Sequence, residues 1–343
     1  MDPTVAIVIV NWNGWRDTIE CLESIWRVTY PNYWVVLVDN GSSDDSLAKM
    51  NEYCNGKIEA ESHLLKGKGP PNKPVTMFEI GGEDAFEGVS KNLLQAKIAS
   101  NRRLVLIKNE KNLGFASGSN MGISFALDVL DSKYVLLLNN DTVVDPGFLT
   151  ELVRAGESDK RIGVLGPKMY YYDYQGRSDV ILYAGARIVP WREIVYKHVG
   201  DGEIDKGQYD VDVKTDWCSG AGMMIRESLA RQLKLNTIYH FGNEDVEYCI
   251  KAKKLGWEVA YVHNAKLWHK VGASWAKTER TIRRSIFLYF RFISSNFSLR
   301  WYAYHVLLFL VVVLPRWMFM YLAFHGDRRT LANFVHELRD FVR

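Results

Sequence analysis

The chain has 343 residues, of which 48% are hydrophobic and 24% charged, and its formal net charge is +3. A chain of this length and composition can bury a large core, which excludes an intrinsically disordered protein. The small net charge comes without a run of lysine or arginine, so we expect no nucleic-acid partner. The four cysteines are far apart and form no CxxC pair, as expected of buried thiols in a reducing compartment: Cys21, Cys54, Cys218 and Cys249.

The first elements along the chain are a strand, a turn and a helix. Residues 5–10 read VAIVIV, the turn NWNG follows, and the apolar spacing of DTIECLESIW predicts a helix that begins at Asp17 or Thr18. Met1 lies too close to this strand to leave room for a signal peptide. We therefore expect this part of the protein to lie in the cytoplasm.

Three more apolar strands follow, WVVLVD (34–39), LVLIKN (104–109) and YVLLLN (134–139), and SGSNMGISFALDVL predicts a helix between the last two. Strands of Val, Leu and Ile that alternate with helices predict an α/β fold with a mostly parallel sheet and helices on both faces. Ligands of such sheets bind beyond the carboxyl ends of the strands. The polar residues at those ends should converge on one crevice: Asn11, Asp39, Asn109, Asn139, Asn140 and Asp141.

The segment 55–103 interrupts the alternation of strands and helices. It contains the Gly/Pro/Lys stretch LLKGKGPPNKPV, the apolar run TMFEI, which favours a short strand, and a polar run of helical character. The segment is too long for an ordinary connection within a compact domain. We interpret it as a surface insertion, with a functional flap as the alternative.

The stretch LLLNNDTVVDPGF (136–148) ends a buried strand on two amides and a carboxylate. The chain lacks GxGxxG after its first strand and lacks GxxxxGK[ST], so these two phosphate-binding motifs are excluded. A divalent cation such as Mg²⁺, held by Asp141, would bridge a diphosphate instead. Asn139 and Asn140 would then hydrogen-bond sugar hydroxyls, although the three residues could equally serve only to close a turn.

A second group of polar residues lies in FGNEDVEYCIKAKKLGWEV (241–259). Asn243 can cap a helix there, and Glu244 and Asp245 occupy its first turn, where the helix dipole favours carboxylates even without any chemistry. A carboxylate in that place can also act as a general base that removes a proton from an attacking hydroxyl. In the following HNAKLWHKVGAS, His269 could add an imidazole to a metal site, although ordinary packing is the usual explanation for a single histidine.

The chain resembles the family-2 inverting nucleotide-sugar glycosyltransferases of the GT-A fold, in particular their rhamnosyltransferase-like branch. The resemblance extends from about Val5 to Ser274 and rests on VIVNWNG, VVLVDNGSSDDS, NLGFASGSNMGI, LLLNNDTVVDPGF and NEDVEYCIKAKKLGWEV, in this order, followed by LWHKVGAS. It implies a catalytic domain over residues 1–274 with a Rossmann-like sheet. It also implies transfer of a sugar from a UDP- or dTDP-linked donor to a hydroxyl of a glycan acceptor, in cell-surface glycan biosynthesis.

The same resemblance implies roles for individual residues. Asp245 would be the catalytic base and Glu244 its neighbour at the acceptor site, while Asp141 and His269 would bind Mg²⁺ or Mn²⁺. Asn139 stands at the first position of the family's DxD element, which removes one negative charge from the metal site. The donor would be bound by Asn11, Asp39, Asn112, Gly114, Asn120, Asn139 and Asn140.

The region 275–343 is rich in apolar and aromatic residues. Residues 302–324 are long enough to span a bilayer, but Pro315 and Arg316 interrupt them, and a central arginine costs about 2.5–3.5 kcal/mol on insertion scales. Upstream, RRSIFLYFRF interleaves arginine with aromatic residues, as at a lipid headgroup interface. We expect a helical region that attaches to the cytoplasmic face of a membrane through interfacial or re-entrant helices, which also suggests a lipid-linked acceptor. A buried helical hairpin or a homodimer interface is the alternative.

Two other classes of protein remain as alternatives. A metal-dependent sugar-phosphate nucleotidyltransferase would use a similar domain and a metal-binding carboxylate, but NWNG lacks the basic, glycine-rich signature expected near the first strand. A catalytically inactive binding module would have no need of Asp141, Asp245 and His269 together.

Overall fold

The computed structural model describes residues 2–65, 74–82, 86, 88–97, 102–192, 195–239, 242–271 and 282–316. The chain forms two compact units. Unit 1 comprises residues 1–187 and 198–273, and unit 2 comprises residues 188–197 and 274–343. All residues that the sequence singles out for binding or catalysis lie in unit 1.

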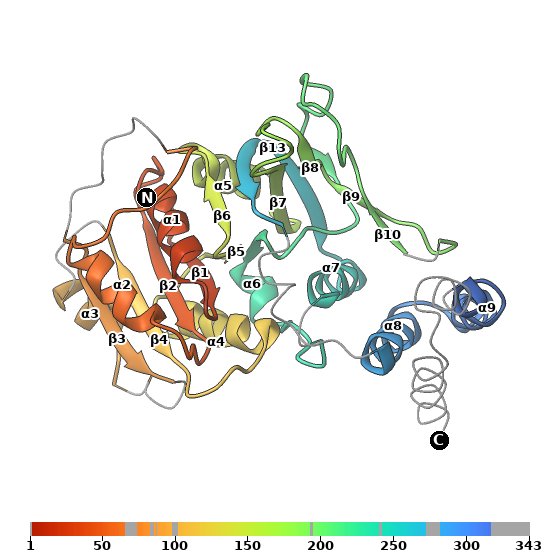
Figure 1. Cartoon of the computed structure of the whole chain (residues 1–343), viewed down its shortest axis with the longest axis horizontal. Coiled ribbons are helices and arrows are strands. Elements are labelled where there is room, and N and C mark those ends of the chain that lie inside the picture. Colours follow the sequence, from red (N-terminus) through yellow and green to blue (C-terminus); the bar gives the residue numbers. More distant parts are fainter. Residues whose placement is uncertain are drawn as a thin grey trace, which may run out of the picture. The chain divides into compact units, whose positions relative to one another are not determined.

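Unit 1 is built on a sheet of eleven strands (Figure 1). Its main path runs β11-β13-β7-β12-β5-β1-β2-β4-β3, with β6 paired to β13 and β8 to β7. The five strands from β5 to β3 pair in parallel, and β12 is antiparallel to β5 and β7. The parallel strands are β1 (Val5–Asn11), β2 (Tyr33–Asp39), β3 (Met77–Gly81), β4 (Leu104–Lys108) and β5 (Tyr134–Asn139). The others are β6 (Thr142–Val144), β7 (Ile162–Tyr171), β8 (Ile181–Tyr183), β11 (Val213–Lys214), β12 (Gly222–Arg226) and β13 (Glu258–His269), while β9 (Ala186–Ile188) and β10 (Tyr196–His198) form a separate pair.

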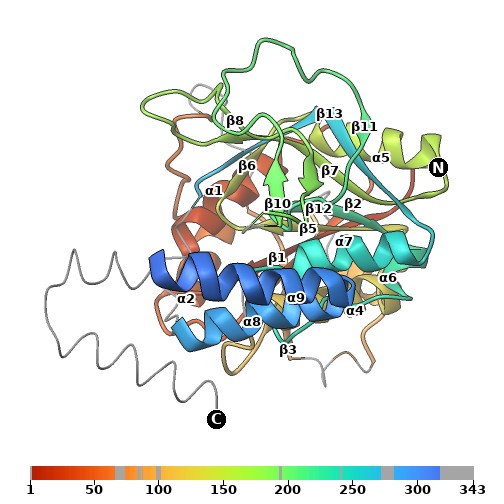
Figure 2. The same cartoon turned by 90° about the vertical axis from the view of Figure 1, so that its right-hand side faces the viewer.

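Helices cover both faces of the parallel part of the sheet. α1 (Trp15–Ile25) and α2 (Ser46–Cys54) follow β1 and β2 and lie side by side (Figure 1). α4 (Phe115–Asp128) leads from β4 back to β5, in the opposite direction along the sheet. Because crossovers between parallel strands are right-handed, α4 lies on the face opposite α1. The remaining helices of unit 1 are α3 (Lys91–Lys97), α5 (Phe148–Ser158), α6 (Glu227–Ala230) and α7 (Glu244–Lys254), and α7 packs against β13 and β7 (Figure 2).

The α/β fold predicted from the sequence is confirmed in its central part. All of β2 and the first five residues of β1 and of β5 are buried, as expected of strands that are apolar at nearly every position. Helix α1 begins at Trp15, before the predicted start at Asp17 or Thr18, because the Gly14 carbonyl already accepts the Thr18 N–H at 3.0 Å.

Helix α4 comes unusually close to the sheet at Gly122. A Cβ atom at this position would lie 2.3 Å from Cγ1 of Val8 in β1, so a larger residue would push the helix away. The close contact fixes the start of α4 near the carboxyl ends of β1 and β2, where the candidate site lies.

The segment 55–103 contributes to the sheet instead of lying wholly outside it. Its strand β3 pairs in parallel with β4 and forms an edge of the sheet. The apolar run at 76–80 therefore does form a strand, as its composition favoured. Its place in the sheet was missed because a five-residue strand between polar stretches carries little signal about its partner.

Unit 2 contains α8 (Ile282–Asn296) and α9 (Leu299–Leu308), which continues into the π-helical turn η3 (Phe309–Val313). Tyr304 donates a hydrogen bond to the Trp191 carbonyl at 2.8 Å, and His305 Nε2 lies 2.8 Å from the Pro190 carbonyl oxygen. Within the described residues, Leu299–Arg316 is one helical stretch long and apolar enough to cross a bilayer, and 11% of it is buried. The rest of the expected span, 317–324, lies outside the described residues.

Candidate active site

The strands of the parallel part end together at one edge of the sheet. The register aligns Asn11 of β1 with Asp39 of β2, and it aligns Asn139 of β5 with Val10. Lys108, the last residue of β4, lies opposite Asp39. The predicted convergence of strand ends is therefore confirmed for Asn11, Asp39 and Asn139.

Asn11 and Asp39 form a rigid floor at this edge, and each is 2% exposed. Asn11 Nδ2 donates to Asp39 Oδ1 at 2.9 Å, and Thr18 donates to Asn11 Oδ1 at 2.9 Å. Ser42 donates to Asp39 twice, from its hydroxyl to Oδ1 at 2.6 Å and from its backbone N–H to Oδ2 at 3.1 Å. Asn140 Nδ2 donates to the Thr18 hydroxyl at 3.0 Å. These bonds fix the loops after β1 and β2 before any ligand arrives.

Asn40, which the sequence analysis did not single out, holds the loop before α4. Its Nδ2 donates to Asn112 Oδ1 at 3.0 Å and to the Gly114 carbonyl at 3.1 Å, and its Oδ1 accepts from Asn109 Nδ2 at 3.1 Å. Gly114 has a φ of +83°, which a residue with a side chain rarely adopts, so a glycine is required at this turn into the helix. Asn112 and Gly114 thus belong to the same edge as Asn11.

Asn120 does not join this group. Its Nδ2 donates to the Leu235 carbonyl at 2.8 Å, and its Oδ1 accepts the Leu235 N–H at 2.9 Å. This pair of hydrogen bonds ties α4 to the segment after α6. The geometry therefore favours a structural role for Asn120 over the donor-binding role implied by the resemblance.

Asp141 and His269 lie next to each other although they are distant in sequence. Strand β13 pairs with β6 so that His269 faces Thr142, and the Lys270 N–H donates to the Asp141 carbonyl at 3.0 Å. As a result, His269 Nε2 lies 3.1 Å from Asp141 Oδ1 and 3.4 Å from Asn139 Nδ2. Asp141 is 3% exposed.

The chemistry of this pair fits a divalent cation. Two ligands about 2.1 Å from one ion and at right angles to each other lie about 3.0 Å apart, close to the separation of the Asp141 and His269 atoms. Asp141 Oδ1 is buried and receives no well-aligned hydrogen bond from the described residues. No cluster of three or more His, Cys, Asp or Glu side chains suited to a metal occurs in the described part of the chain. An ion here would therefore depend on substrate oxygens and water for its other ligands, as Mg²⁺ commonly does.

The charge of Asp141 is stabilised by its neighbours. Burial by itself would raise the pKa of Asp141, but the nearby His269 and Lys270 outweigh burial and hold the pKa below its usual value. Lys270 is in turn fixed by ion pairs to Asp17 at 2.6 Å and to Glu20 at 2.5 Å on α1. Burial alone would lower the pKa of Lys270, but these two carboxylates raise it, so the lysine remains charged. This clamp of Lys270 between Asp17 and Glu20 was not predicted, because nothing in the sequence pairs α1 with the end of β13.

Asp245 lies in the first turn of α7 and is half-buried. Its Oδ2 accepts the Gly220 N–H at 2.8 Å, and its Oδ1 accepts the Val246 N–H at 2.8 Å. Burial raises the pKa of Asp245, and these N–H groups reverse the shift only in part. Asn243, predicted to cap the helix, has a left-handed φ of +73° and its side chain makes no capping hydrogen bond. Glu244 is 5% exposed.

His198 is a further residue of this region that the sequence analysis missed. Its Nδ1 lies 3.0 Å from the Leu182 carbonyl oxygen, and its ring packs against Tyr183 and Trp217. Burial lowers the pKa of His198; Asp201, the Leu182 carbonyl and Asp245 act in the opposite direction, and His269 acts in the same direction as burial. His198 therefore lies within electrostatic range of both proposed functional groups. It was missed because a single histidine in YKHV carries no motif.

The sequence matches the models of two related protein families. Residues 83–287, more than half of its length, match the model of the glycosyltransferase-like family 2, and residues 6–66 match that of glycosyl transferase family 2. The chain belongs to glycosyltransferase family 2. This protein is also similar to mouse (Mus musculus) hyaluronan synthase 2, with 26% identity over 176 residues that cover 48% of this chain and 29% of that protein. The glycosyltransferase GlyG of Streptococcus pneumoniae serotype 4 is 24% identical over 174 residues, which cover 51% of this chain and 41% of that protein.

This family-2 glycosyltransferase spans less than a third of the length of the hyaluronan synthase that it matches. Among solved structures, that of GalNAc-T7 with UDP, GalNAc and Mn²⁺ is similar, with a TM-score of 0.55 and 17% identity, and the match covers 85% of this chain and 48% of that one. At this identity the likeness concerns the fold alone. The fold class predicted from the sequence, a GT-A type of α/β fold, is confirmed.

Proposed function

We propose that this protein is an inverting glycosyltransferase that moves a sugar from a UDP- or dTDP-linked donor to a hydroxyl of a glycan or lipid-linked acceptor. The observation that carries the proposal is the pair Asp141 and His269, whose atoms are 3.1 Å apart at the edge of a sheet in a family-2 chain. The rhamnosyltransferase-like motifs make a rhamnosyl or hexosyl group the expected sugar.

Mg²⁺ or Mn²⁺ is the proposed cofactor, with Asp141 and His269 as its protein ligands. Such an ion, when bound, neutralises the charge of a diphosphate. The buried and charged carboxylate of Asp141 supports this assignment, and the similar GalNAc-T7 structure contains UDP and Mn²⁺. Asn139 adjoins this pair through its contact with His269 and would reach the sugar or the diphosphate.

The nucleoside would lie over the ends of β1 and β2. Asn11 and Asp39 are both fully engaged with neighbouring side chains, so their contribution would be to hold the loops around the base and ribose in place. Asn140 donates hydrogen bonds to Asn11 and Thr18 and would contact the sugar of the donor. Asn112 and Gly114 would line the donor at the start of α4, where Asn112 Oδ1 accepts the Gly114 N–H at 2.8 Å and so holds the turn in place.

Asp245 is the proposed general base. Each of its oxygens accepts one backbone N–H, which leaves lone pairs on both for the acceptor hydroxyl. The hydroxyl gives its proton to Asp245 while its oxygen bonds to the anomeric carbon, and the bond from that carbon to the diphosphate breaks on the opposite face, so the configuration inverts. The raised pKa of Asp245, which burial causes, strengthens it as a base. Glu244, next to Asp245 in the first turn of α7, would help to position the acceptor.

A screen of nucleotide sugars tests the proposal. The full chain is incubated with UDP- and dTDP-sugars and either Mn²⁺ or Mg²⁺, and the released nucleoside diphosphate is measured. We expect release from one donor, dependent on the ion and faster with the correct acceptor. Formation of pyrophosphate from a nucleoside triphosphate and a sugar phosphate would identify the nucleotidyltransferase instead, and the absence of both reactions would leave a binding module.

Residues 1–274 would form the catalytic domain, and residues 275–343 would attach it to the cytoplasmic face of a membrane. Residues 282–316 contain no Asp or Glu, and several apolar side chains of α9 and η3 are exposed, which suits a surface of anionic lipid. Deletion of residues 300–343 should abolish flotation with liposomes and leave nucleotide binding intact. If the full chain never floats, the region instead packs within the protein or forms a homodimer.

A further inference from the structure

A cavity of about 360 Å³ opens on unit 1 and shares no residue with the candidate active site. Its volume lies within the range of about 300–1,000 Å³ that is usual for small-molecule sites. It is formed by the start of β9, the segment 209–216, strand β13 and the last turn of α7. Its aromatic and charged lining includes Arg187, Tyr209, Lys214, Asp216 and Lys253.

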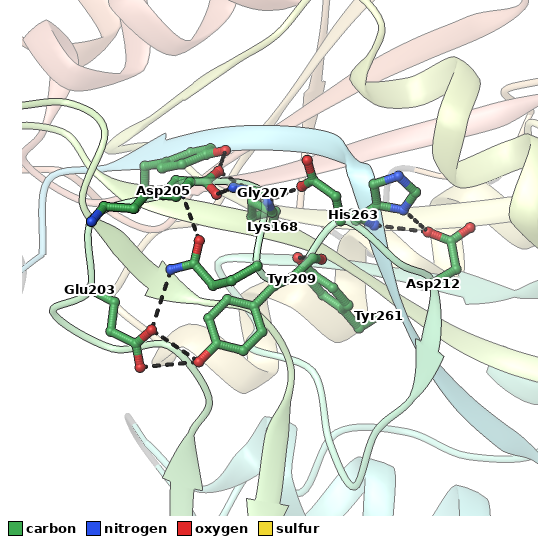
Figure 3. A network of polar contacts seen from close by, with 12 residues as sticks. Lys168, Glu203, Asp205, Gly207, Tyr209, Asp212, Tyr261 and His263 are labelled. Atoms are coloured by element: carbon green, nitrogen blue, oxygen red, sulfur yellow. Dashed lines mark hydrogen bonds and ion pairs between the residues drawn. The ribbon is translucent and has the colours of Figure 1, made fainter.

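One wall of the cavity is anchored by a buried lysine (Figure 3). Lys168 of β7 has a side chain that is 0% exposed, and its Nζ lies 3.0 Å from Asp205 Oδ2 and 2.5 Å from Asp210 Oδ1. Tyr170 donates to the same Asp205 oxygen at 2.5 Å. A buried ammonium group is stable only when it is paired, so the segment between the two aspartates is held firmly against the sheet.

Tyr209 lies in this anchored segment and is fixed from three sides. Its hydroxyl donates to Glu203, at 3.0 and 3.1 Å from the two carboxylate oxygens, and its carbonyl accepts from the Tyr261 hydroxyl at 3.2 Å (Figure 3). Gly200, with a φ of +76°, allows the ring to pack against the backbone, since a Cβ there would lie 2.8 Å from the ring. A ring immobilised in advance loses little entropy on binding, and its face suits the apolar face of a sugar.

The charges around the cavity are unbalanced. Three cationic side chains and one carboxylate line it: Arg187, Lys214, Lys253 and Asp216. Lys253 pairs with Asp216 at 2.6 Å, and Lys214 pairs with Glu258, outside the cavity, at 2.6 Å. Both are exposed pairs that contribute little stability and exchange easily. Arg187 makes no ion pair or hydrogen bond with the described residues and is exposed, so its guanidinium is available to a ligand.

We propose that this cavity binds a sugar that carries an acidic group, a carboxylate or a phosphate. Tyr209 takes the face of the ring, and Arg187 with Lys253 takes the acid, since a guanidinium binds such groups through paired hydrogen bonds. Lys253 is eight residues after Asp245 on α7, which places the cavity about 12 Å along the helix from the proposed base. The bound sugar is therefore a non-reacting unit of the acceptor, and only this assignment to the acceptor rests on the proposed function.

Titration of the full chain with four probes tests the inference: glucose, glucuronate, glucose 6-phosphate and inorganic phosphate. We expect one or both acidic sugars to bind about tenfold more tightly than glucose and than phosphate, because one charge-assisted contact is added to the stacking. Arg187→Ala should remove this preference and leave the weak binding of glucose unchanged. Lys253→Gln, in the last turn of α7, should also remove the preference for acidic sugars. The stronger of the two acidic sugars identifies the acidic group.

The matched control is Lys206→Ala. It removes an exposed cation from the segment that carries Tyr209, but this cation does not line the cavity, so all four affinities should stay unchanged. Equal binding of glucose and the acidic sugars, phosphate binding as tight as that of glucose 6-phosphate, or an intact preference in both Arg187→Ala and Lys253→Gln would each overturn the inference. Donor hydrolysis by the same variants reports on the proposed transferase separately. If the wild type does not hydrolyse any donor but keeps the preference for acidic sugars, the proposed function is contradicted and this binding site is not.

Discussion

The surroundings of Asp141, at the ends of β5 and β13, and those of Asp245, at the start of α7, have opposite effects on a carboxylate. Burial by itself raises the pKa of both. Around Asp141, His269 and Lys270 outweigh burial, and the pKa falls below its usual value. Around Asp245, N–H groups such as that of Gly220 compensate only in part, and the pKa remains raised. The same residue type is thereby suited to hold a cation in one place and to take a proton in the other.

Asp245→Asn tests the second half of this comparison and should have the largest effect. The amide keeps the shape of the side chain but cannot take a proton, so transfer should fall by about 10²- to 10⁴-fold. Donor affinity should persist. Because the pKa is raised, the charged form of Asp245 disfavours the fold above its unfolded pKa. Removal of this charge should offset the loss of one of the two backbone N–H bonds that the carboxylate accepts, so the melting temperature at neutral pH should change little. Near-normal transfer would reduce Asp245 to a helix-start residue, and Glu244→Gln, measured alongside, should lose less activity.

Asp141→Ala tests the first half of the comparison. Removal of the only carboxylate in the Asn139–Asp141 triplet should abolish the part of nucleoside diphosphate binding that depends on Mn²⁺, because no other side chain there carries a negative charge. Calorimetry with UDP or dTDP, with and without the ion, measures this. A folded variant with unchanged ion-dependent affinity would remove Asp141 from the metal site.

Lys270→Met asks whether the clamp behind Asp141 matters to the ion. Loss of the ammonium leaves Glu20, 1% exposed, without its cation, and should cost about 3 kcal/mol of unfolding free energy. Without the neighbouring Lys270, Asp141 and His269 are held less firmly, and ion-dependent binding should weaken by about tenfold. Chemical denaturation and calorimetry check the two effects. Lys266→Met, on β13 four residues before Lys270, is the control. An equal loss there would mean that this part of the chain tolerates no Lys→Met change.

His198→Gln should have the smallest effect and concerns the pH dependence. The base must be deprotonated to act, so transfer should be lost as the pH falls through the pKa of Asp245, at a pH above its ordinary 3.8. His198, when charged, lowers that pKa, so its removal should move this acid limb slightly to higher pH. The rate of transfer at saturating donor, measured across the acid range, gives the shift. A limb that moves to lower pH would contradict the arrangement.

The ends of the central strands were predictable because the signal is local. A parallel sheet aligns the carboxyl ends of its strands, so Asn11, Asp39 and Asn139 could be placed together from apolar runs that stop at polar residues. Asn120 and Asn243 show the limit of the motif. The Asn120 side chain hydrogen-bonds to the distant Leu235 backbone, and the Asn243 side chain makes no capping hydrogen bond. Both outcomes depend on tertiary contacts that a sequence motif does not encode.

The sequence by itself determined the alternation of strands and helices, the polar edge of the sheet and the membership of Asp141 and Asp245 in two separate motifs, because these follow from periodicity and from neighbours in the chain. Only the tertiary structure decided that His269 meets Asp141, that Lys270 binds α1, and that Lys168 fixes the wall in which Tyr209 stands. Each of these depends on the pairing of strands far apart in sequence, and burial and neighbouring charge, which set the opposite pKa shifts of the two aspartates, exist only once that pairing has formed.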